Sequence, residues 1–166
     1  MQPRLTLIGM PGAGKSTLGK ALAKRLDLPF IDTDQRIEAK HGPLQPLIHR
    51  LGPQGFTQLE ESFLLKLNPE QAIIATGGSA IYSKTGIEHL ASLGPVIYLW
   101  APFNVIEQRI HNLDQRGLVR RQHQSLADLY RERDPLYRQH ANLILPTHQT
   151  SQAELVDQLA QYLNES

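Results

Sequence analysis

The stretch that decides the fold of this chain is Gly9-Met10-Pro11-Gly12-Ala13-Gly14-Lys15-Ser16. It contains a glycine, four further residues, a second glycine, a lysine and a serine, in that order. A short apolar run at residues 4–8 precedes it, and apolar residues at helical spacing follow it, namely Leu18, Ala21, Leu22 and Leu26. A strand, a glycine-rich loop and a helix in this order direct backbone N–H groups and a helix N-terminus at anionic oxygens. The sequence therefore predicts a binding site for the phosphates of a nucleoside triphosphate.

The backbone and the side chains of this loop are expected to bind different parts of the ligand. The backbone of Gly12, Ala13 and Gly14 curls around the phosphates, and Thr17 continues the loop into the helix. The side chains that follow are expected to add a point charge for the β- and γ-phosphates and a hydroxyl ligand for Mg²⁺, from Lys15 and Ser16 respectively. The alternative is a glycine-rich turn that only caps a helix. The flanking strand and helix favour the nucleotide site.

Composition excludes several other classes of function. The 166 residues are 40% hydrophobic, with 17 basic and 16 acidic residues, which predicts one compact domain over residues 1–166. A net charge of +1 without a basic stripe argues against a nucleic-acid partner. The chain has no cysteine, which excludes disulfides, thiolate metal sites and cysteine nucleophiles, and its seven histidines show no metal-ligand spacing.

The N-terminal residues lead directly into the first expected strand. They contain no apolar segment of the kind found in signal peptides, and no apolar run in the chain approaches the ~18 residues of a membrane span. We therefore expect a cytoplasmic monomer without a membrane partner.

Strand and helix patterns alternate along the chain. Strands are expected at residues 4–8, 29–31, 72–75, 95–99 and 143–145, and helices at 17–26, 35–41, 54–67, 84–92, 102–112, 125–140 and 151–163. The last helix should begin with a capping box formed by Ser151 and Glu154. Such alternation predicts a parallel sheet with helices on both faces, in which ligands gather at the carboxyl ends of the strands.

Asp32-Thr33-Asp34 follows the second expected strand directly. One carboxylate at this strand end could anchor Mg²⁺ through its water shell, and the other could orient or deprotonate an acceptor hydroxyl. The alternative is that Asp34 caps the helix that begins at Gln35. A neighbouring phosphate loop favours the functional interpretation.

Gly77-Gly78-Ser79 follows the central apolar strand. Paired glycines let a ligand lie against backbone amides, and Ser79 offers a hydroxyl. An ordinary tight turn is the alternative.

Two basic segments lie late in the chain. Arg133 stands two residues before Pro135 on an expected helix, and its planar fork suits a carboxylate or a phosphate. A solvated charged face is the alternative. The polar, basic residues at about 112–124 are expected to form a lid that excludes water, with a plain surface loop as the alternative.

Taken in order, these motifs resemble the shikimate kinase family over nearly the whole chain: the loop at 9–16, Asp32-Thr33-Asp34, Gly77-Gly78, and Arg133-Asp134-Pro135-Leu136-Tyr137. The resemblance implies an α/β fold, the P-loop nucleoside-monophosphate-kinase-like three-layer sandwich with a five-stranded parallel sheet. It implies an acceptor-binding helical subdomain at about 32–62 and a lid at about 112–124. It also implies ATP, Mg²⁺ and transfer of the γ-phosphoryl group to a hydroxyl of shikimate or a similar polyol acid.

The resemblance also implies roles for the acceptor and metal residues. Asp32 would support the metal ligated by Ser16, and Asp34 would contact the acceptor hydroxyl as base or orienter. Gly77 and Gly78 would contact the acceptor through their backbone, and Arg133 would pair with its carboxylate.

On the nucleotide side, the resemblance implies that Arg109 stacks on the adenine and that residues 146–149, with Gln149, lie beside it. Arg120 would be the lid arginine that reaches the transferring phosphate, with Arg116 and Arg121 as alternatives. The catalytic residues would thus be Lys15, Asp34 and Arg120.

Three departures from the family pattern concern the acceptor and the lid. Thr57 stands where the family has an arginine that grips the substrate carboxylate, and the loss of such a contact costs on the order of 1.5–3 kcal/mol. Ser79 replaces a third glycine and should crowd the floor of the acceptor site. The lid reads Arg120-Arg121-Gln122-His123 where the family has Arg-Pro-Leu-Leu. Two further functions therefore stay open: a kinase for another hydroxylated metabolite, such as a sugar acid, and a non-catalytic ATP-binding regulator.

Overall fold

The computed structural model describes residues 4–110 and 118–165, so residues 112–117 of the expected lid, including Arg116, lie outside the described part. Within it, five strands form one parallel sheet in the order β2-β3-β1-β4-β5. The strands are β1 (Arg4–Ile8), β2 (Phe30–Asp32), β3 (Ala72–Ala75), β4 (Val96–Trp100) and β5 (Leu143–Pro146). The expected α/β fold with a five-stranded parallel sheet is confirmed.

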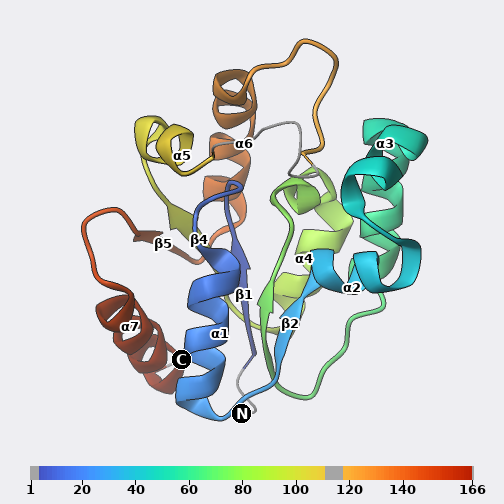
Figure 1. The fold of residues 1–166 in the computed structure, drawn as a ribbon. Coiled ribbons are helices and arrows are strands. Elements are labelled where there is room, and N and C mark those ends of the chain that lie inside the picture. Colours follow the sequence, from blue (N-terminus) through green and yellow to red (C-terminus); the bar gives the residue numbers. More distant parts are fainter. Residues whose placement is uncertain (1–3, 111–117, 166) are drawn as a thin grey trace.

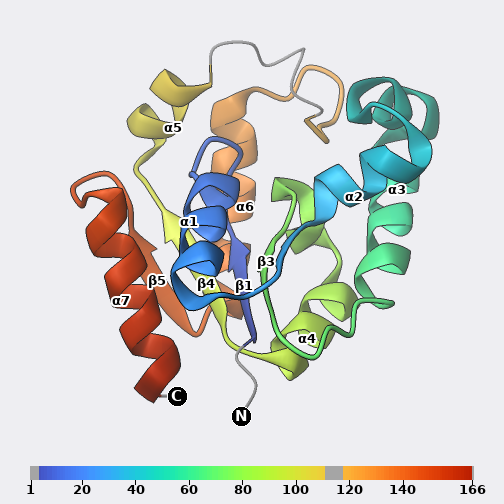
Figure 2. The same ribbon diagram turned by 60° about the horizontal axis from the view of Figure 1, so that its bottom comes forward.

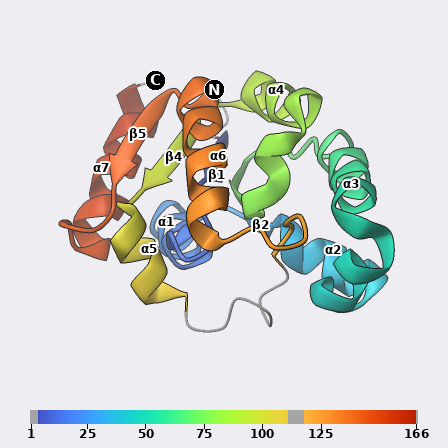
Figure 3. The ribbon, with the colours of Figure 1, turned by 90° about the horizontal axis from the view of Figure 1, so that it is seen from above.

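Helices cover both faces of this sheet. α1 (Lys15–Leu26) and α7 (Gln152–Glu165) lie on one face, and α4 (Lys84–Leu93) and α6 (Leu126–His140) on the other (Figures 1 and 2). Seen from above, α2 (Thr33–His41) and α3 (Leu44–Leu64) lie beyond the β2 side, and α5 (Phe103–Arg109) lies toward β5 (Figure 3). A 3₁₀ helix, η1 (Gly78–Tyr82), follows β3. No helix in these described segments combines the length and the apolar character that a membrane crossing requires.

The core lies on both faces of the central strands. Side chains that alternate across β1, β3 and β4 are completely buried, among them Leu5, Leu7, Ile73, Ile74 and Ile97. A strand buried on both faces is apolar at nearly every position, which explains the apolar runs in these segments; Thr6 of β1 is the buried polar exception.

A second, smaller cluster lies under α2 and α3. It consists of Ile37, Leu44, Leu47, Ile48, Phe56 and Val119. Val119 comes from the expected lid and packs against the helices that follow β2. This contact places the end of the lid segment beside the carboxyl ends of the strands.

α3 corrects the expected helix at 54–67. The helix begins at Leu44 and ends at Leu64, with a kink at Gly52, whose φ of 70° is left-handed. Pro53 starts the second half, because proline fits the first turn of a helix. The first half carries two prolines, Pro43 as its N-cap and Pro46 within its first turn, where a missing backbone N–H is tolerated.

The helix expected at 102–112 is also shorter in the described residues. α5 ends at Arg109, and Ile110 adopts an extended conformation. Its start after Pro102 agrees with the expectation.

Candidate active site

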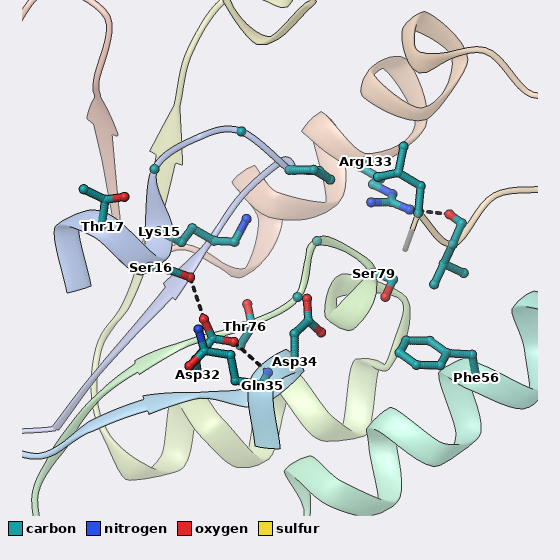
Figure 4. A pocket seen from close by; sticks show the side chains of 17 residues that line it. Lys15, Ser16, Thr17, Asp32, Asp34, Gln35, Phe56, Thr76, Ser79 and Arg133 are labelled. Carbon is teal, nitrogen blue, oxygen red and sulfur yellow. Dashed lines mark hydrogen bonds between the residues drawn. The ribbon is translucent and has the colours of Figure 1, made fainter. Parts of the chain in front are cut away.

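A cavity of about 340 Å³ lies where the carboxyl ends of β1, β2 and β3 meet (Figure 4). The structure brings together in its lining most of the expected site residues, namely Gly12, Gly14, Lys15, Ser16, Thr17, Asp32, Asp34, Gly77, Gly78, Ser79 and Arg133. Residues not expected there also line it, namely Pro11, Gln35, Phe56, Thr76, Leu118 and Val119. The topology therefore gathers four motifs that are far apart in the sequence.

The phosphate loop connects β1 to α1. Gly14 is the N-cap of α1 and has a φ of 95°, a conformation that side-chain-bearing residues rarely adopt. The Nζ of Lys15 donates to the carbonyl oxygens of Gly9 at 2.7 Å and Met10 at 2.8 Å. Burial lowers the pKa of Lys15 to about 8, against the opposing effect of nearby carboxylates, chiefly Asp34. Two carbonyl oxygens thus hold the Lys15 ammonium over the loop. Phosphate oxygens bound there would replace the water that burial removes from this ammonium.

Ser16 and Asp32 are directly bonded to each other. The Ser16 hydroxyl donates to Oδ2 of Asp32 at 2.6 Å, while Oδ1 accepts from the backbone N–H of Gln35 at 3.1 Å (Figure 4). Asp32 is therefore the N-cap of α2. The alternative in which Asp34 caps this helix is wrong, because Asp34 lies inside the first turn and lines the cavity.

The oxygen atoms of Ser16 and Asp32 suit Mg²⁺, which prefers hard oxygen ligands, keeps several waters and is completed by substrate phosphates. The described residues contain no group of three or more His, Cys, Asp or Glu side chains that could hold a metal by themselves. A site with one hydroxyl and one carboxylate fits a metal that arrives with phosphates.

Asp34 is packed between the phosphate loop and the start of η1. A Cβ at position 77 would collide with the Asp34 carboxylate, so only glycine allows this approach. Burial raises the pKa of Asp34 to about 6, and the charge of Lys15 limits the rise. A carboxylate with a pKa near neutrality is ionised yet basic enough to accept a proton from a hydroxyl.

Arg133 is 1% exposed, so the alternative of a solvated charged face is wrong. Its Nη2 donates to the carbonyl oxygen of Val119 at 2.6 Å, and its Nε donates to the Tyr82 hydroxyl at 3.1 Å. The guanidinium also lies over the Tyr82 ring, 5.1 Å from its centroid. α6 continues through Pro135, and Arg133 still faces the cavity.

The reasoning from sequence missed Glu60, which lies behind the cavity wall and bonds to the lining residue Ser79. Its side chain is completely buried, and its Oε1 accepts a hydrogen bond from the Ser79 hydroxyl at 2.8 Å. Ser79 therefore does more than crowd the cavity floor. A signal was present, because Phe56, Glu60 and Leu64 recur every four residues on the buried face of α3 and place a carboxyl in an apolar stripe.

Thr57, Arg120 and Arg121 do not line this cavity. They line a separate cavity of about 380 Å³ beside it. The Thr57 hydroxyl donates to the carbonyl oxygen of Pro53 at 2.9 Å, and Arg120 donates to the carbonyl oxygen of Gln124 at 3.1 Å. Arg121 pairs with Glu132 at 3.4 Å.

A third cavity, of about 250 Å³, lies on the other side of the phosphate loop. Its lining includes Gly12, Ala13, Thr17, Arg109 and Thr147. Arg109 donates to the carbonyl oxygen of Gly12 at 3.3 Å. From the expected segment 146–149, Thr147 lines this cavity, whereas Gln149 is exposed and does not.

Trp100, at the end of β4, lies near this cavity. Its indole N–H donates to the Tyr130 hydroxyl at 3.0 Å. The ring meets His148 edge-on, with 5.4 Å between centroids, and His148 directly follows Thr147.

Comparison with known proteins identifies the family of this fold and site. The family model of shikimate kinase matches residues 11–164. The shikimate kinase of Psychrobacter cryohalolentis is 38% identical over 166 residues, which cover 98% of this chain and 89% of the relative. The shikimate kinase of Aromatoleum aromaticum is 39% identical over 145 residues, which cover 85% of this chain and 83% of the relative.

Two solved structures share the fold over nearly their whole length. Shikimate kinase from Acinetobacter baumannii in complex with shikimate superimposes with a TM-score of 0.89 and 34% identity, covering 99% of this chain and 94% of the other. Shikimate kinase from Aquifex aeolicus superimposes with a TM-score of 0.83 and 27% identity, covering 97% and 96%. The chain is therefore a phosphotransferase that acts on a hydroxyl group, and it belongs to the shikimate kinase family.

Proposed function

We propose that this protein transfers the γ-phosphoryl group of ATP to a hydroxyl of shikimate, with Mg²⁺ as cofactor. One observation carries the proposal: Asp34 lies in a single cavity between the lysine of a phosphate loop and a buried arginine. Phosphorylation of an alcohol that carries a carboxylate needs three things side by side. These are a base for the hydroxyl, a site for the ATP phosphates and a site for the carboxylate. The likeness to a kinase solved in complex with shikimate supports this choice of acceptor.

The phosphoryl donor would be held by the loop. Backbone amides at Gly12 to Thr17 and the Lys15 ammonium would neutralise the β- and γ-phosphates, and Ser16 and Asp32 would hold Mg²⁺. When bound, the metal supplies further charge neutralisation on the phosphate oxygens. Much of the catalysis would therefore be positioning and electrostatic stabilisation.

The acceptor would lie on the opposite wall of the cavity. Asp34 would orient its hydroxyl and accept the proton as the oxygen bonds to the γ-phosphorus and the bond to the β-phosphate oxygen breaks. Arg133 would pair with the acceptor carboxylate, and the backbone of Gly77 and Gly78 would lie against its ring. ADP and the phosphorylated acid leave.

The proposal also gives roles to arginines beside the adenine and in the lid. Arg109, which already lines the cavity on the far side of the loop, would cover the adenine, with Gln149 nearby. Arg120 would reach the transferring phosphate only after moving from its position beside Gln124.

ADP release from Mg·ATP with and without shikimate tests the proposal. Strong stimulation by shikimate is expected, and Lys15→Ala and Asp34→Asn should each lower turnover at least a hundredfold in folded protein. The exposed Asp157, replaced by Asn, provides a matched control. Unchanged turnover in either variant would refute its role.

One observation favours a second candidate. Thr57 bonds within its own helix, and Arg133 is the only arginine or lysine apart from Lys15 in the lining formed by the described residues. A different hydroxylated acid, such as a sugar acid, could therefore fit better, and a panel of polyol acids in the same assay would identify it. Absence of stimulation by every acid would favour a non-catalytic ATP-binding regulator.

A further inference from the structure

Glu60 is a carboxyl group inside the protein, and only one of its two oxygens has a hydrogen-bond partner among the described residues. It projects from α3, and its side chain is completely buried. Ser79 satisfies Oε1 at 2.8 Å, while Oε2 has no hydrogen-bond partner among the described residues. An ionised carboxylate in this position would leave one charged oxygen without a donor, at considerable free-energy cost.

A protonated Glu60 resolves this difficulty. If the proton is on Oε1, Glu60 donates to the Ser79 oxygen, and Oε2 becomes a neutral carbonyl oxygen, which costs less to bury unpaired than a charged one. The hydroxyl of Ser79 then has its own proton free. Since Ser79 lines the cavity, that proton can be donated to a ligand there.

Ionisation of Glu60 reverses the direction of the bond. A carboxylate only accepts, so Ser79 must donate to it and can offer the cavity only lone pairs. The same serine is therefore a donor or an acceptor toward the cavity, according to the proton on Glu60.

We propose that Ser79 and Glu60 form a reversible hydrogen-bond pair in which protonated Glu60 makes the floor of the acceptor cavity a hydrogen-bond donor, so that an anionic acceptor binds best while Glu60 holds its proton. The proposal rests on the proposed function, since it names how the acceptor is recognised. It assigns to this chain an anion site built from one guanidinium, Arg133, and one neutral donor, Ser79. Glu60 acts through Ser79 and is a positioning residue.

The charged groups around Glu60 agree with this arrangement. Burial is the main cause that raises the pKa of Glu60 to about 8, and the negative charge of Asp34 on α2 acts in the same direction. The Ser79 hydrogen bond, Arg133 on α6 and Lys15 on α1 act in the opposite direction without overcoming burial. At neutral pH Glu60 is therefore mostly protonated, and its ionisation falls in an accessible pH range.

The test is the KM for shikimate, or for the acid found best in the panel, measured between about pH 6 and 9.5 at saturating Mg·ATP. In the wild type, KM should rise roughly three- to tenfold above pH 8, the worth of one hydrogen bond. Glu60→Gln, whose amide always can donate to Ser79, should keep the neutral-pH KM and remove this rise. Ser79→Ala should raise KM at pH 7 by a similar factor.

Glu61→Gln is the matched control. Glu61 is the next residue of α3 and accepts from two hydroxyls, those of Ser83 and Thr85, outside the cavity. This variant should retain the wild-type pH profile. Lys15 and Asp34 remain in every variant, so a rise of KM that persists in Glu60→Gln belongs to their titration and not to that of Glu60. A wild-type KM that does not change with pH, or an equal rise in Glu60→Gln, overturns the proposal.

Infrared spectroscopy separates this proposal from the function on which it rests. A protonated-carboxyl carbonyl band at pH 7 should disappear in Glu60→Gln, persist in Glu61→Gln and shift in Ser79→Ala. If no acid is phosphorylated but the band behaves in this way, the proposed function fails while the pair stands. If the band is absent at pH 7, the pair is refuted whatever the activity.

Discussion

The Arg133 guanidinium donates to the carbonyl oxygen of Val119 at 2.6 Å, and this bond joins α6 to the described end of the lid. The Val119 side chain packs with Phe56 of α3 in the smaller apolar cluster. One arginine thus faces the acceptor cavity and holds the segment that borders it. Arginine can do both because its fork carries five N–H donors.

Replacing Arg133 by lysine should weaken acceptor binding. Lysine keeps the positive charge but cannot reach two partners through a planar fork. The loss of a charge-assisted contact corresponds to roughly a ten- to hundredfold higher acceptor KM. The KM for ATP should change little, because the phosphate loop is intact.

Steady-state kinetics of both substrates checks this prediction. Arg131→Lys is the control, since Arg131 is on the same helix but pairs with Asp128 at the surface. An equal increase in both KM values in Arg133→Lys would show that the arginine supports the whole fold rather than the acceptor.

Asp32 should show two separable effects. Asp32→Asn keeps a side-chain oxygen for the N–H of Gln35, whereas Asp32→Ala removes the cap and should cost about 1 kcal/mol of unfolding free energy. Both variants should require more Mg²⁺ for half-maximal rate, because both lack the charge beside Ser16. Thermal unfolding and a Mg²⁺ titration measure the two effects; an unchanged Mg²⁺ requirement in both variants would restrict Asp32 to capping.

Gly77→Ala should displace Asp34. The new Cβ would meet the Asp34 carboxylate, which has to turn away from the acceptor position. We expect turnover to fall at least tenfold, since misplacement of a catalytic group by about 1 Å can have such an effect. Gly55→Ala, on α3 outside the cavity lining, is the control for stability. Wild-type turnover in folded Gly77→Ala would contradict the proposed contact.

The stability of the protein should depend on the proton of Glu60. The unfolded carboxyl ionises near pH 4.5, whereas burial holds the folded one protonated up to about pH 8. Between these values the native state binds more protons than the unfolded state, so this contribution to stability falls as pH rises and levels off above pH 8. The limiting slope for one proton is about 1.4 kcal/mol per pH unit.

Urea unfolding at pH 5, 6.5 and 8 should therefore show that the free energy of unfolding of Glu60→Gln increases relative to that of the wild type as pH rises. Glu61→Gln should not, because hydrogen bonds from Ser83 and Thr85 lower the pKa of Glu61 below this range. A constant difference between Glu60→Gln and wild type would mean that Glu60 is ionised in the folded protein.

The sequence was sufficient to predict those features that depend on residues close together in the chain. The phosphate loop depends on a single contiguous segment, and the central strands β3 and β4 are apolar throughout because both of their faces are covered. The capping box of α7 also forms as expected, with the Ser151 hydroxyl accepting from the Glu154 N–H at 3.3 Å and the Glu154 carboxylate accepting from the Ser151 N–H at 3.0 Å.

The features that could not be predicted from the sequence depend on contacts between elements or on the exact start of an element. Either Asp32 or Asp34 could cap a helix by its spacing, and only the exact start of α2 decides between them. The bond between Glu60 and Ser79 joins residues nineteen positions apart on different elements. Spacing alone also could not show that Thr57 lies outside the lining of the cavity that holds Asp34, because that depends on the rotation of α3 relative to the cavity.

Trp100 is the sole tryptophan of the chain, and its ring contacts His148, whose neighbour Thr147 lines the third cavity, on the other side of the phosphate loop. Its fluorescence therefore reports on a single place in the molecule. A nucleotide that reorders the segment after β5 should change the emission of Trp100, so that the arrival and departure of ATP and ADP can be timed in a stopped-flow instrument without any attached dye.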